Sequence, residues 1–303
     1  MLSLRSVVTF ALATAAGCAR HTAPSTAAAP PDGMEAAILA REAAVPGAVV
    51  RVAAFRLDGT GPRLMLRADS LVHAASTMKV PVMIALARRD DGDRRTLDAT
   101  MPLTNRFTSI VDGSPYTLGR GDDSDDSVYA RVGRDVAVRW LATRMITHSS
   151  NLATNALLTV IAPDSVTALM RALGASRMVV RRGVEDTPAF RAGLNNVTTA
   201  GDLAAIMAAI ATDRAASPAA CAWMREVLFA QHWNDAIPTG LPPGTRIAHK
   251  TGNITAVEHD AAIVYPASGA PYVLVILTSG VPDPAVAKRL IADVARIVHA
   301  ALP

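Results

Sequence analysis

Segments with the alternating pattern of β-strands fall into two groups, one near each end of the chain, and this arrangement allows few folds. The first group is residues 48–57 and 62–67, joined by a glycine-rich turn. The second is residues 245–254, 259–266 and 270–280. A sheet of two or three strands is only marginally stable in water. We therefore expect the two groups to join into one five-stranded antiparallel sheet.

Helical periodicity dominates the rest of the chain. Residues 136–229 are alanine-rich and mostly helical in pattern, and amphipathic helices are expected at residues 32–44 and 283–302. The predicted fold class is α/β (α+β), with the sheet covered by the terminal helices and a mostly helical lobe inserted. Half of the residues are apolar, which is enough for a sizeable core.

The boundaries of the predicted lobes place a cleft between them. The sheet lobe would comprise residues 34–75 and 246–303, and the helical lobe residues 76–245, together one domain spanning 34–303. A cleft between lobes is a common place for a ligand site.

Charge and cysteine content exclude several functions. The formal charge is +4, from 30 basic and 26 acidic residues, but the basic residues are scattered and aromatic residues make up 4% of the chain. This composition argues against nucleic acid as a partner. There is no HExxH or CxxC motif, so we expect no metal site. Besides Cys18 the only cysteine is Cys221, expected to be buried.

The N-terminal residues predict export. Residues 1–17 have the short apolar core of a signal peptide, and small residues before Cys18 resemble a bacterial lipoprotein cleavage site. Leucine is usual where this chain has Ala15, so ordinary cleavage near Ala19 is the alternative. Residues 18–33 would form a flexible Ala/Pro linker. The predicted location is the periplasm, or the membrane through a lipid on Cys18.

Lysine is rare in this chain. Only three of the 30 basic residues are lysines, Lys79, Lys250 and Lys288. Lys79 follows Ser76 by three residues in a helix expected at 77–88, with Ser76 as its N-cap. A buried lysine can lose its proton and act as a base, which arginine cannot do. On its own, the pair fits a helix cap and a lysine that reaches solvent better than it fits a catalytic pair.

Two further short motifs follow in the chain. Lys250-Thr251-Gly252 lies on a predicted strand. A second cation there would lower the pKa of Lys79 and attract a carboxylate, and Gly252 would let a substrate lie along the strand. Ser149 and Asn151 lie between the other motifs, where a hydroxyl could relay a proton, although such a segment also suits a helix cap.

Taken together, Ser-x-x-Lys, Ser-x-Asn and Lys-Thr-Gly in this order resemble the active-site set of the penicillin-recognising serine enzymes. The chain is most similar to the class A β-lactamase family, as a divergent member, and the resemblance covers about Met34 to Leu302. It implies a serine hydrolase that opens the β-lactam amide through an acyl-enzyme. The implied substrate is a small molecule, a β-lactam or a related amide or ester, and no cofactor is implied.

The resemblance also implies roles for individual residues. Ser76 would be the nucleophile, Lys79 its base or proton shuttle, and Ser149 the donor to the leaving nitrogen. Substrate would be held by the remaining residues of the motifs: Asn151, Lys250 and Thr251 by their side chains, Gly252 by its lack of one, and Asn253 by a backbone N–H that forms the oxyanion site with that of Ser76.

Two departures from the family pattern leave alternatives open. Ser150 replaces the family's aspartate, which is expected to cost a structural hydrogen bond rather than chemistry. Glu185 lies within one residue of the position expected for the deacylating glutamate, but Ala189 stands where the family has asparagine. Glu185 or Asp186 could instead pair with Arg181 or Arg182 and only shape the loop. The acidic loop at 119–129 is expected to be solvated, or to form one rim of the cleft.

The alternative functions follow from these departures. One is a D,D-peptidase or esterase with the same acylation machinery and slow deacylation. The other is a non-catalytic protein that binds penicillin or cell-wall peptides.

Overall fold

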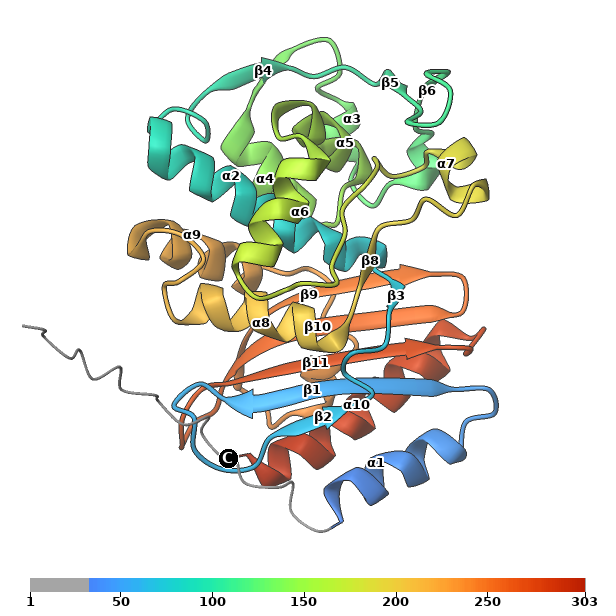
Figure 1. Cartoon of the computed structure of the whole chain (residues 1–303), viewed down its shortest axis with the longest axis vertical. Helices are drawn as coiled ribbons and strands as arrows, with labels where there is room; N and C mark the ends of the chain where they lie inside the picture. The colour runs from blue at the N-terminus through green and yellow to red at the C-terminus, as the bar shows by residue number, and fades with distance from the viewer. Residues whose placement is uncertain (1–32, 303) are drawn as a thin grey trace, which may run out of the picture.

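A five-stranded antiparallel sheet joins the two ends of the chain, as predicted (Figure 1). Strand β1 pairs with β11 from Val49 opposite Ser279 to Arg56 opposite Tyr272. The strand order is β2-β1-β11-β10-β9, with bounds β1 (Val49–Arg56), β2 (Leu64–Leu66), β9 (Arg246–Ile254), β10 (Val257–Tyr265) and β11 (Tyr272–Ser279).

The computed structural model describes residues 33–302. The predicted signal segment 1–17, Cys18 and the linker up to residue 32 lie outside the described residues. The lobe boundaries after residue 75 and before residue 246 remain a prediction.

Helices cover both faces of the sheet. Helices α1 (Met34–Ala43) and α10 (Pro284–Ala301) lie on one face, and α8 (Ala200–Ala211) lies on the other (Figure 1). The central strand β11 is almost entirely apolar because both of its faces are covered. Strand β9, which carries Lys250, lies at the edge of this sheet and pairs with β10.

The inserted helical lobe lies above α8 in Figure 1 and is built around the buried helix α2. Among the described residues, no single helix has the length and apolar character needed to cross a membrane. Helices α5 (Asn151–Val160) and α6 (Pro163–Ala172), bent by 85° from each other, meet that criterion as a pair. The bounds are α2 (Lys79–Asp93), α3 (Asp126–Tyr129), α4 (Val138–Thr147), α5 (Asn151–Val160), α6 (Pro163–Ala172), α7 (Thr187–Arg191), α9 (Pro218–Phe229), the 3-10 helices η1 (Ala75–Met78), η2 (Arg120–Asp122) and η3 (Ile237–Gly240), and the short strands β3 (Val72–His73), β4 (Thr100–Pro102), β5 (Phe107–Thr108), β6 (Pro115–Tyr116), β7 (Asp135–Ala137) and β8 (Val197–Thr198).

One local prediction is wrong. Ser76 is not the N-cap of a helix that begins at Thr77, because it lies inside η1, and α2 begins only at Lys79. Ala75 has a positive φ of 45°, and the Thr77 N–H donates to the Ala74 carbonyl, so the chain turns tightly before the helix. This turn presents Ser76 ahead of α2 rather than on its cap.

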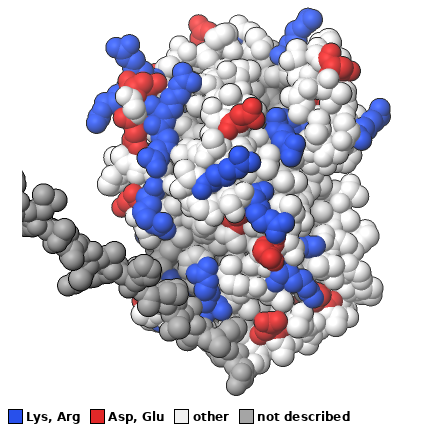
Figure 2. All heavy atoms as spheres, in the orientation of Figure 1, with Lys and Arg blue, Asp and Glu red and all other residues white. Residues whose placement is uncertain are grey.

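Charged side chains are dispersed over the surface. On the face shown in Figure 2, basic side chains are interspersed with acidic ones, and several basic side chains follow one another down the upper left of the view. That the chain does not bind nucleic acid stays a prediction from its composition.

A close backbone approach between η3 and α10 gives a test of the packing. A Cβ added at Gly240 would lie 2.1 Å from the Ala292 carbonyl oxygen, so we expect Gly240→Ala to lower the free energy of unfolding by about 2–3 kcal/mol. The measurement is the midpoint of urea unfolding. Gly92→Ala is the control: it meets nothing within 4 Å and lies in α2, so it should stabilise by about 0.5–1 kcal/mol. Equal midpoints for the two variants would contradict the packing.

Candidate active site

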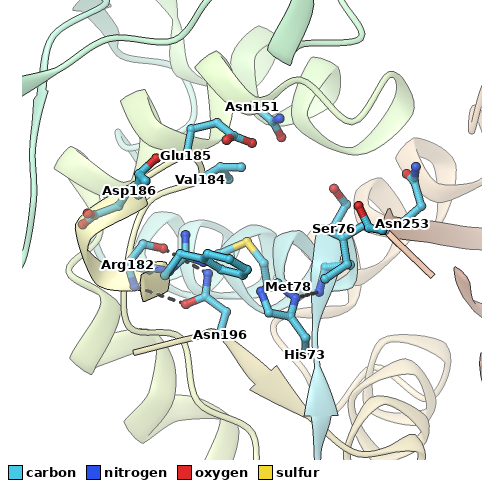
Figure 3. Close-up of a pocket in the computed structure, with 15 residues that line it drawn as sticks. His73, Ser76, Met78, Asn151, Arg182, Val184, Glu185, Asp186, Asn196 and Asn253 are labelled. Carbon is cyan, nitrogen blue, oxygen red and sulfur yellow. Dashed lines mark hydrogen bonds between the residues drawn. The ribbon is translucent and has the colours of Figure 1, made fainter. Parts of the chain in front are cut away.

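Three segments that are far apart in the sequence meet where β9 passes the turn that carries Ser76. A Cβ on Gly252 would lie 2.9 Å from the backbone nitrogens of both Ser76 and Thr77, so only glycine permits this approach. Ser76 and Asn253 line the same cavity of about 350 Å³. In Figure 3 these two residues lie close together, facing Glu185 and Asn151 on the helical lobe.

Lys79 is fully buried and donates only to groups of the second motif. Its Nζ lies 2.5 Å from the Ser149 carbonyl oxygen, 3.2 Å from Ser149 Oγ and 2.7 Å from Asn151 Oδ1. Burial holds the pKa of Lys79 well below its usual value, and the Lys250 charge lowers it further. Asp123 and Glu185 oppose that shift in pKa. An amine in this state is suited to accept a proton.

Lys250 is also fully buried and shares the same hydroxyl. Its Nζ donates to Ser149 Oγ at 3.0 Å and to the Thr251 carbonyl oxygen at 2.8 Å. Burial lowers the pKa of Lys250 to about 7, against the opposing charge of Asp260. The Ser149 hydroxyl therefore lies between two amines whose pKa values are both lowered by burial, that of Lys250 to about 7.

Backbone strain is concentrated at this site. Seven non-glycine residues within 33–302 have positive φ, and three of them are Ala75 (45°), Ser149 (61°) and Glu185 (60°). Each such residue costs on the order of 1–3 kcal/mol and persists only where its surroundings enforce it. Ala75 directly precedes the nucleophile. Ser149 carries the hydroxyl that the two lysines share, and Glu185 carries the candidate deacylating carboxylate.

Asn155, which the sequence motifs did not identify, holds the loop that carries Glu185. Buried Asn155 accepts from the Val184 N–H at 2.6 Å and donates to the Val184 carbonyl at 2.9 Å, which fixes the backbone next to Glu185. Glu185 itself is exposed and lines the cavity (Figure 3). The available signal was spacing, because Asn155 follows Asn151 by one helical turn in an apolar helix.

The ion pairs considered for this loop do not form. No ion pair joins Glu185 or Asp186 to Arg181 or Arg182 in the part of the chain that the structure describes. Asp186 shapes the loop through other partners: it accepts from the Ser109 hydroxyl at 2.7 Å and the Ile110 N–H at 3.0 Å.

The expectation that the acidic loop is solvated is confirmed only in part, because Asp122 and Asp126 are exposed and two other carboxylates of the loop are not. Asp125 is buried and its carboxylate lies 2.5 Å from Arg144 Nε, while Asp123 is half-buried rather than solvated. That a structural hydrogen bond of the family's aspartate is lost at Ser150 stays a prediction. The Ser150 hydroxyl caps α5 by accepting from the Ala153 N–H and donates to Asp123 Oδ2 at 3.0 Å. The loop enters the site because its carboxylates have buried donors to satisfy.

The predicted site residues therefore fall into two groups. Ser76, Asn151, Glu185 and Asn253 line the cavity. The rest lie on the elements around it: Lys79 begins α2, Ser149 precedes α5, and Lys250, Thr251 and Gly252 lie on β9. Within residues 33–302, no group of three His, Cys, Asp or Glu side chains is placed to hold a metal ion.

Comparison with known proteins agrees with this geometry. Residues 34–302 match a family model described as the beta-lactamase enzyme family. The chain belongs to this family. It is a serine hydrolase of the β-lactamase type, as the three motifs predict, and its fold is that of the class A enzymes.

Several solved structures resemble the chain. PBP-A is 26% identical, with a TM-score of 0.76 over 91% of this chain and 97% of that one. A beta-lactamase from Sphaerobacter thermophilus is 26% identical, with a TM-score of 0.73 over 89% and 95%. The ancestral GNCA class A beta-lactamase is 25% identical, with a TM-score of 0.76 over 89% and 100%. No curated protein sequence matches this chain.

The scarcity of lysine in this β-lactamase homologue permits a direct test of its electrostatics. With ¹³C-labelled lysine, we expect one side-chain signal to titrate near pH 7, from Lys250, and the Lys79 signal to titrate well below 10.5. For Lys288, burial acts downward, but its bond to Asp235 raises the pKa above the usual value, so this signal is the internal reference. Lys288→Arg removes only that signal.

The same shift fixes a sign for stability. The unfolded chain keeps a proton on Lys250 up to about its ordinary pKa of 10.5, whereas the folded chain releases it near 7. The contribution of Lys250 to the free energy of unfolding therefore rises as pH rises through that range. Three lysine signals that all titrate above pH 10 would contradict the buried, shared site.

Proposed function

We propose that the chain hydrolyses β-lactams in two steps, through an ester between the substrate acyl group and Ser76. The observation that carries this proposal is the Ser149 hydroxyl held between the amines of Lys79 and Lys250. This arrangement supplies a base for the nucleophile and a proton for the leaving nitrogen in one connected set of groups.

Acylation follows from these contacts. The Ser76 oxygen attacks the lactam carbonyl carbon as its proton passes to the neutral Lys79 amine. The oxyanion is held by the N–H groups of Ser76 and Asn253, across the close approach at Gly252. The lactam C–N bond then breaks, and the nitrogen takes the hydroxyl proton of Ser149, which Lys79 replaces.

Substrate recognition rests on Lys250. A substrate carboxylate beside Lys250 and Thr251 favours the ammonium form, because an opposite charge raises the pKa that burial has lowered. Asn151 lines the cavity wall, where its Nδ2, which donates one hydrogen to the Asp122 carbonyl, has a second hydrogen for the substrate. The substrate class is thus a small anionic amide or ester.

Glu185 is proposed to activate the water that releases the acyl group. In support, Glu185 lines the cavity that holds Ser76, has a strained backbone and follows the Val184 backbone fixed by Asn155. One observation favours the second candidate, a D,D-peptidase or esterase with slow deacylation: Ala189 is fully buried and brings no amide to the water. Among the similar structures is an L158E mutant of PBP-A described as an acyl-enzyme complex with penicillin-G.

We further propose that the enzyme acts outside the cytoplasm. The support is the apolar N-terminal segment ahead of Cys18, with lipid attachment at Cys18 as the form expected from its flanking residues. An exported or membrane-anchored enzyme would destroy β-lactams before they reach cell-wall synthesis, giving resistance.

Removal of the nucleophile tests the first step. We expect Ser76→Ala to lower nitrocefin hydrolysis by on the order of 10³-fold or more, because it removes the attacking oxygen. Intact-mass spectrometry of the unmodified protein with penicillin should show an acyl adduct or its turnover, and Ser76→Ala should show neither. An unmodified protein with neither adduct nor turnover would instead be a non-catalytic binder.

Deacylation needs a separate variant. Glu185→Gln keeps the shape of the side chain and removes the base, so the penicillin adduct on Ser76 should persist on the order of 10²-fold longer than in the unmodified protein. The measurement is intact mass over time, with Glu226→Gln, exposed on α9, as the control. An adduct that is long-lived in the unmodified protein and unaffected by Glu185→Gln would establish the slow-deacylation candidate.

A further inference from the structure

Asp123 makes contacts that link the acidic loop to the active site. Its Oδ2 accepts from the Ser150 hydroxyl at 3.0 Å and from the Leu152 N–H at 2.7 Å. Both donors belong to the start of α5, whose N-cap is Ser150. A single carboxylate oxygen from the preceding loop therefore fastens the segment on either side of Asn151.

The loop is built to hold this carboxylate in place. Asp125 forms a salt bridge with Arg144 on α4, in which the carboxylate is 2% exposed and the guanidinium 23% exposed. The Tyr129 hydroxyl donates to the Gly119 carbonyl at 2.8 Å, and the Gly119 N–H donates to Asp122 at 2.9 Å. Asp123 is thus fixed by its neighbours before any substrate arrives.

A second contact from the same loop completes a path to the base. The Asn151 side chain donates through Nδ2 to the Asp122 carbonyl at 2.6 Å and accepts through Oδ1 from Lys79 Nζ at 2.7 Å. Both ends of the Asn151 amide are therefore assigned, which sets the oxygen toward Lys79. Any shift of the Asp122–Asp123 backbone would be transmitted to the Lys79 amine.

Electrostatics act along the same path. The charged groups that affect the pKa of Lys79 are Lys250 on β9, which lowers it, and Asp123 and Glu185 on two different loops, which raise it. Burial raises the pKa of Asp123, while its two donors and the charge of Lys79 act to lower it. Asp123 is the carboxylate that both contacts the Ser-x-Asn motif and acts on the base.

We propose that Asp123 is a positioning residue of this active site: its carboxylate, supplied from the preceding loop, takes the place of a carboxylate at position 150 and orients Asn151 toward Lys79. The proposal rests on the function proposed above. On this proposal the second motif requires one carboxylate at this place, and that carboxylate can come from position 123 or from position 150.

This exchange of position predicts a characteristic pattern among variants. Asp123→Asn leaves the motif without a carboxylate, and Ser150→Asp alone brings two carboxylates together, which repel each other. The double variant Asp123→Asn/Ser150→Asp has a single carboxylate again. Each single change should therefore be harmful, and the second should repair the first.

The experiment measures penicillin acylation by quenched intact-mass spectrometry across pH, and Tm, for these three variants and for Asp126→Asn. Asp126 is the matched control because it lies in the same loop with its side chain 84% exposed. Asp123→Asn should slow acylation by about 10- to 100-fold, as expected for a misplaced reacting group. It should lower Tm by several degrees, while the double variant recovers most of both and Asp126→Asn changes neither.

The pH profile separates positioning from a purely structural role. Loss of the Asp123 charge lowers the pKa of Lys79 further, so the amine is neutral from a lower pH and the acidic limb of the acylation profile should move down. In the double variant that limb should return, because a carboxylate is again nearby. A loss of folding alone would lower the rate without moving the limb.

Two outcomes would overturn the proposal: Asp123→Asn indistinguishable from Asp126→Asn, or a double variant no better than Asp123→Asn. A failure of the proposed function would look different, since the unmodified protein would then not be acylated at all. In that case the Tm values still decide, because additive effects of Asp123→Asn and Ser150→Asp would exclude the exchange of position.

Discussion

Two fully buried lysines sharing one serine hydroxyl form the constraint on which the rest of the site depends. Burying a charged amine is costly unless it is paired or loses its proton, and neither Lys79 nor Lys250 makes a salt bridge within residues 33–302. Oxygen atoms of Ser149, Asn151 and Thr251 receive their hydrogen bonds instead. The amines are therefore hydrogen-bonded to neutral groups. Because no salt bridge stabilises their ammonium forms, burial lowers the pKa of both lysines.

Holding those neutral groups in place requires both lobes. The sheet supplies Lys250 on its edge strand β9, which pairs along its length with the buried strand β10, so its backbone cannot yield easily. The helical lobe supplies Ser149 in a left-handed conformation that costs energy. Gly252 lets β9 approach the turn that carries Ser76, because a side chain at this position would collide with the Ser76 and Thr77 backbone nitrogens. Strain in the loops is tolerated because the sheet and helices around them are rigid.

How far the sequence predicts this arrangement depends on the range of each interaction. Strands β1 and β9–β11 end within a few residues of their predicted bounds, because alternation is a local signal. The motif residues were found through their order. By contrast, the hydrogen bonds of Asn155 with Val184 and of Asp123 with Ser150 join positions that are 29 and 27 residues apart. Only the folded chain brings these together. The acidic loop was expected to be solvated because charge content alone does not show which carboxylates will meet buried donors.

The two lysines are also suited to different protonation states. When an anionic substrate arrives, its carboxylate favours the ammonium form of Lys250, whose pKa of about 7 leaves it ready to take up a proton. The positive charge on Lys250 lowers the pKa of Lys79, so protonating the binding lysine helps to keep the other amine neutral. Substrate binding would thus help to keep Lys79 in the neutral form in which it acts as a base. Arginine at either position would break this coupling, because a guanidinium keeps its proton throughout.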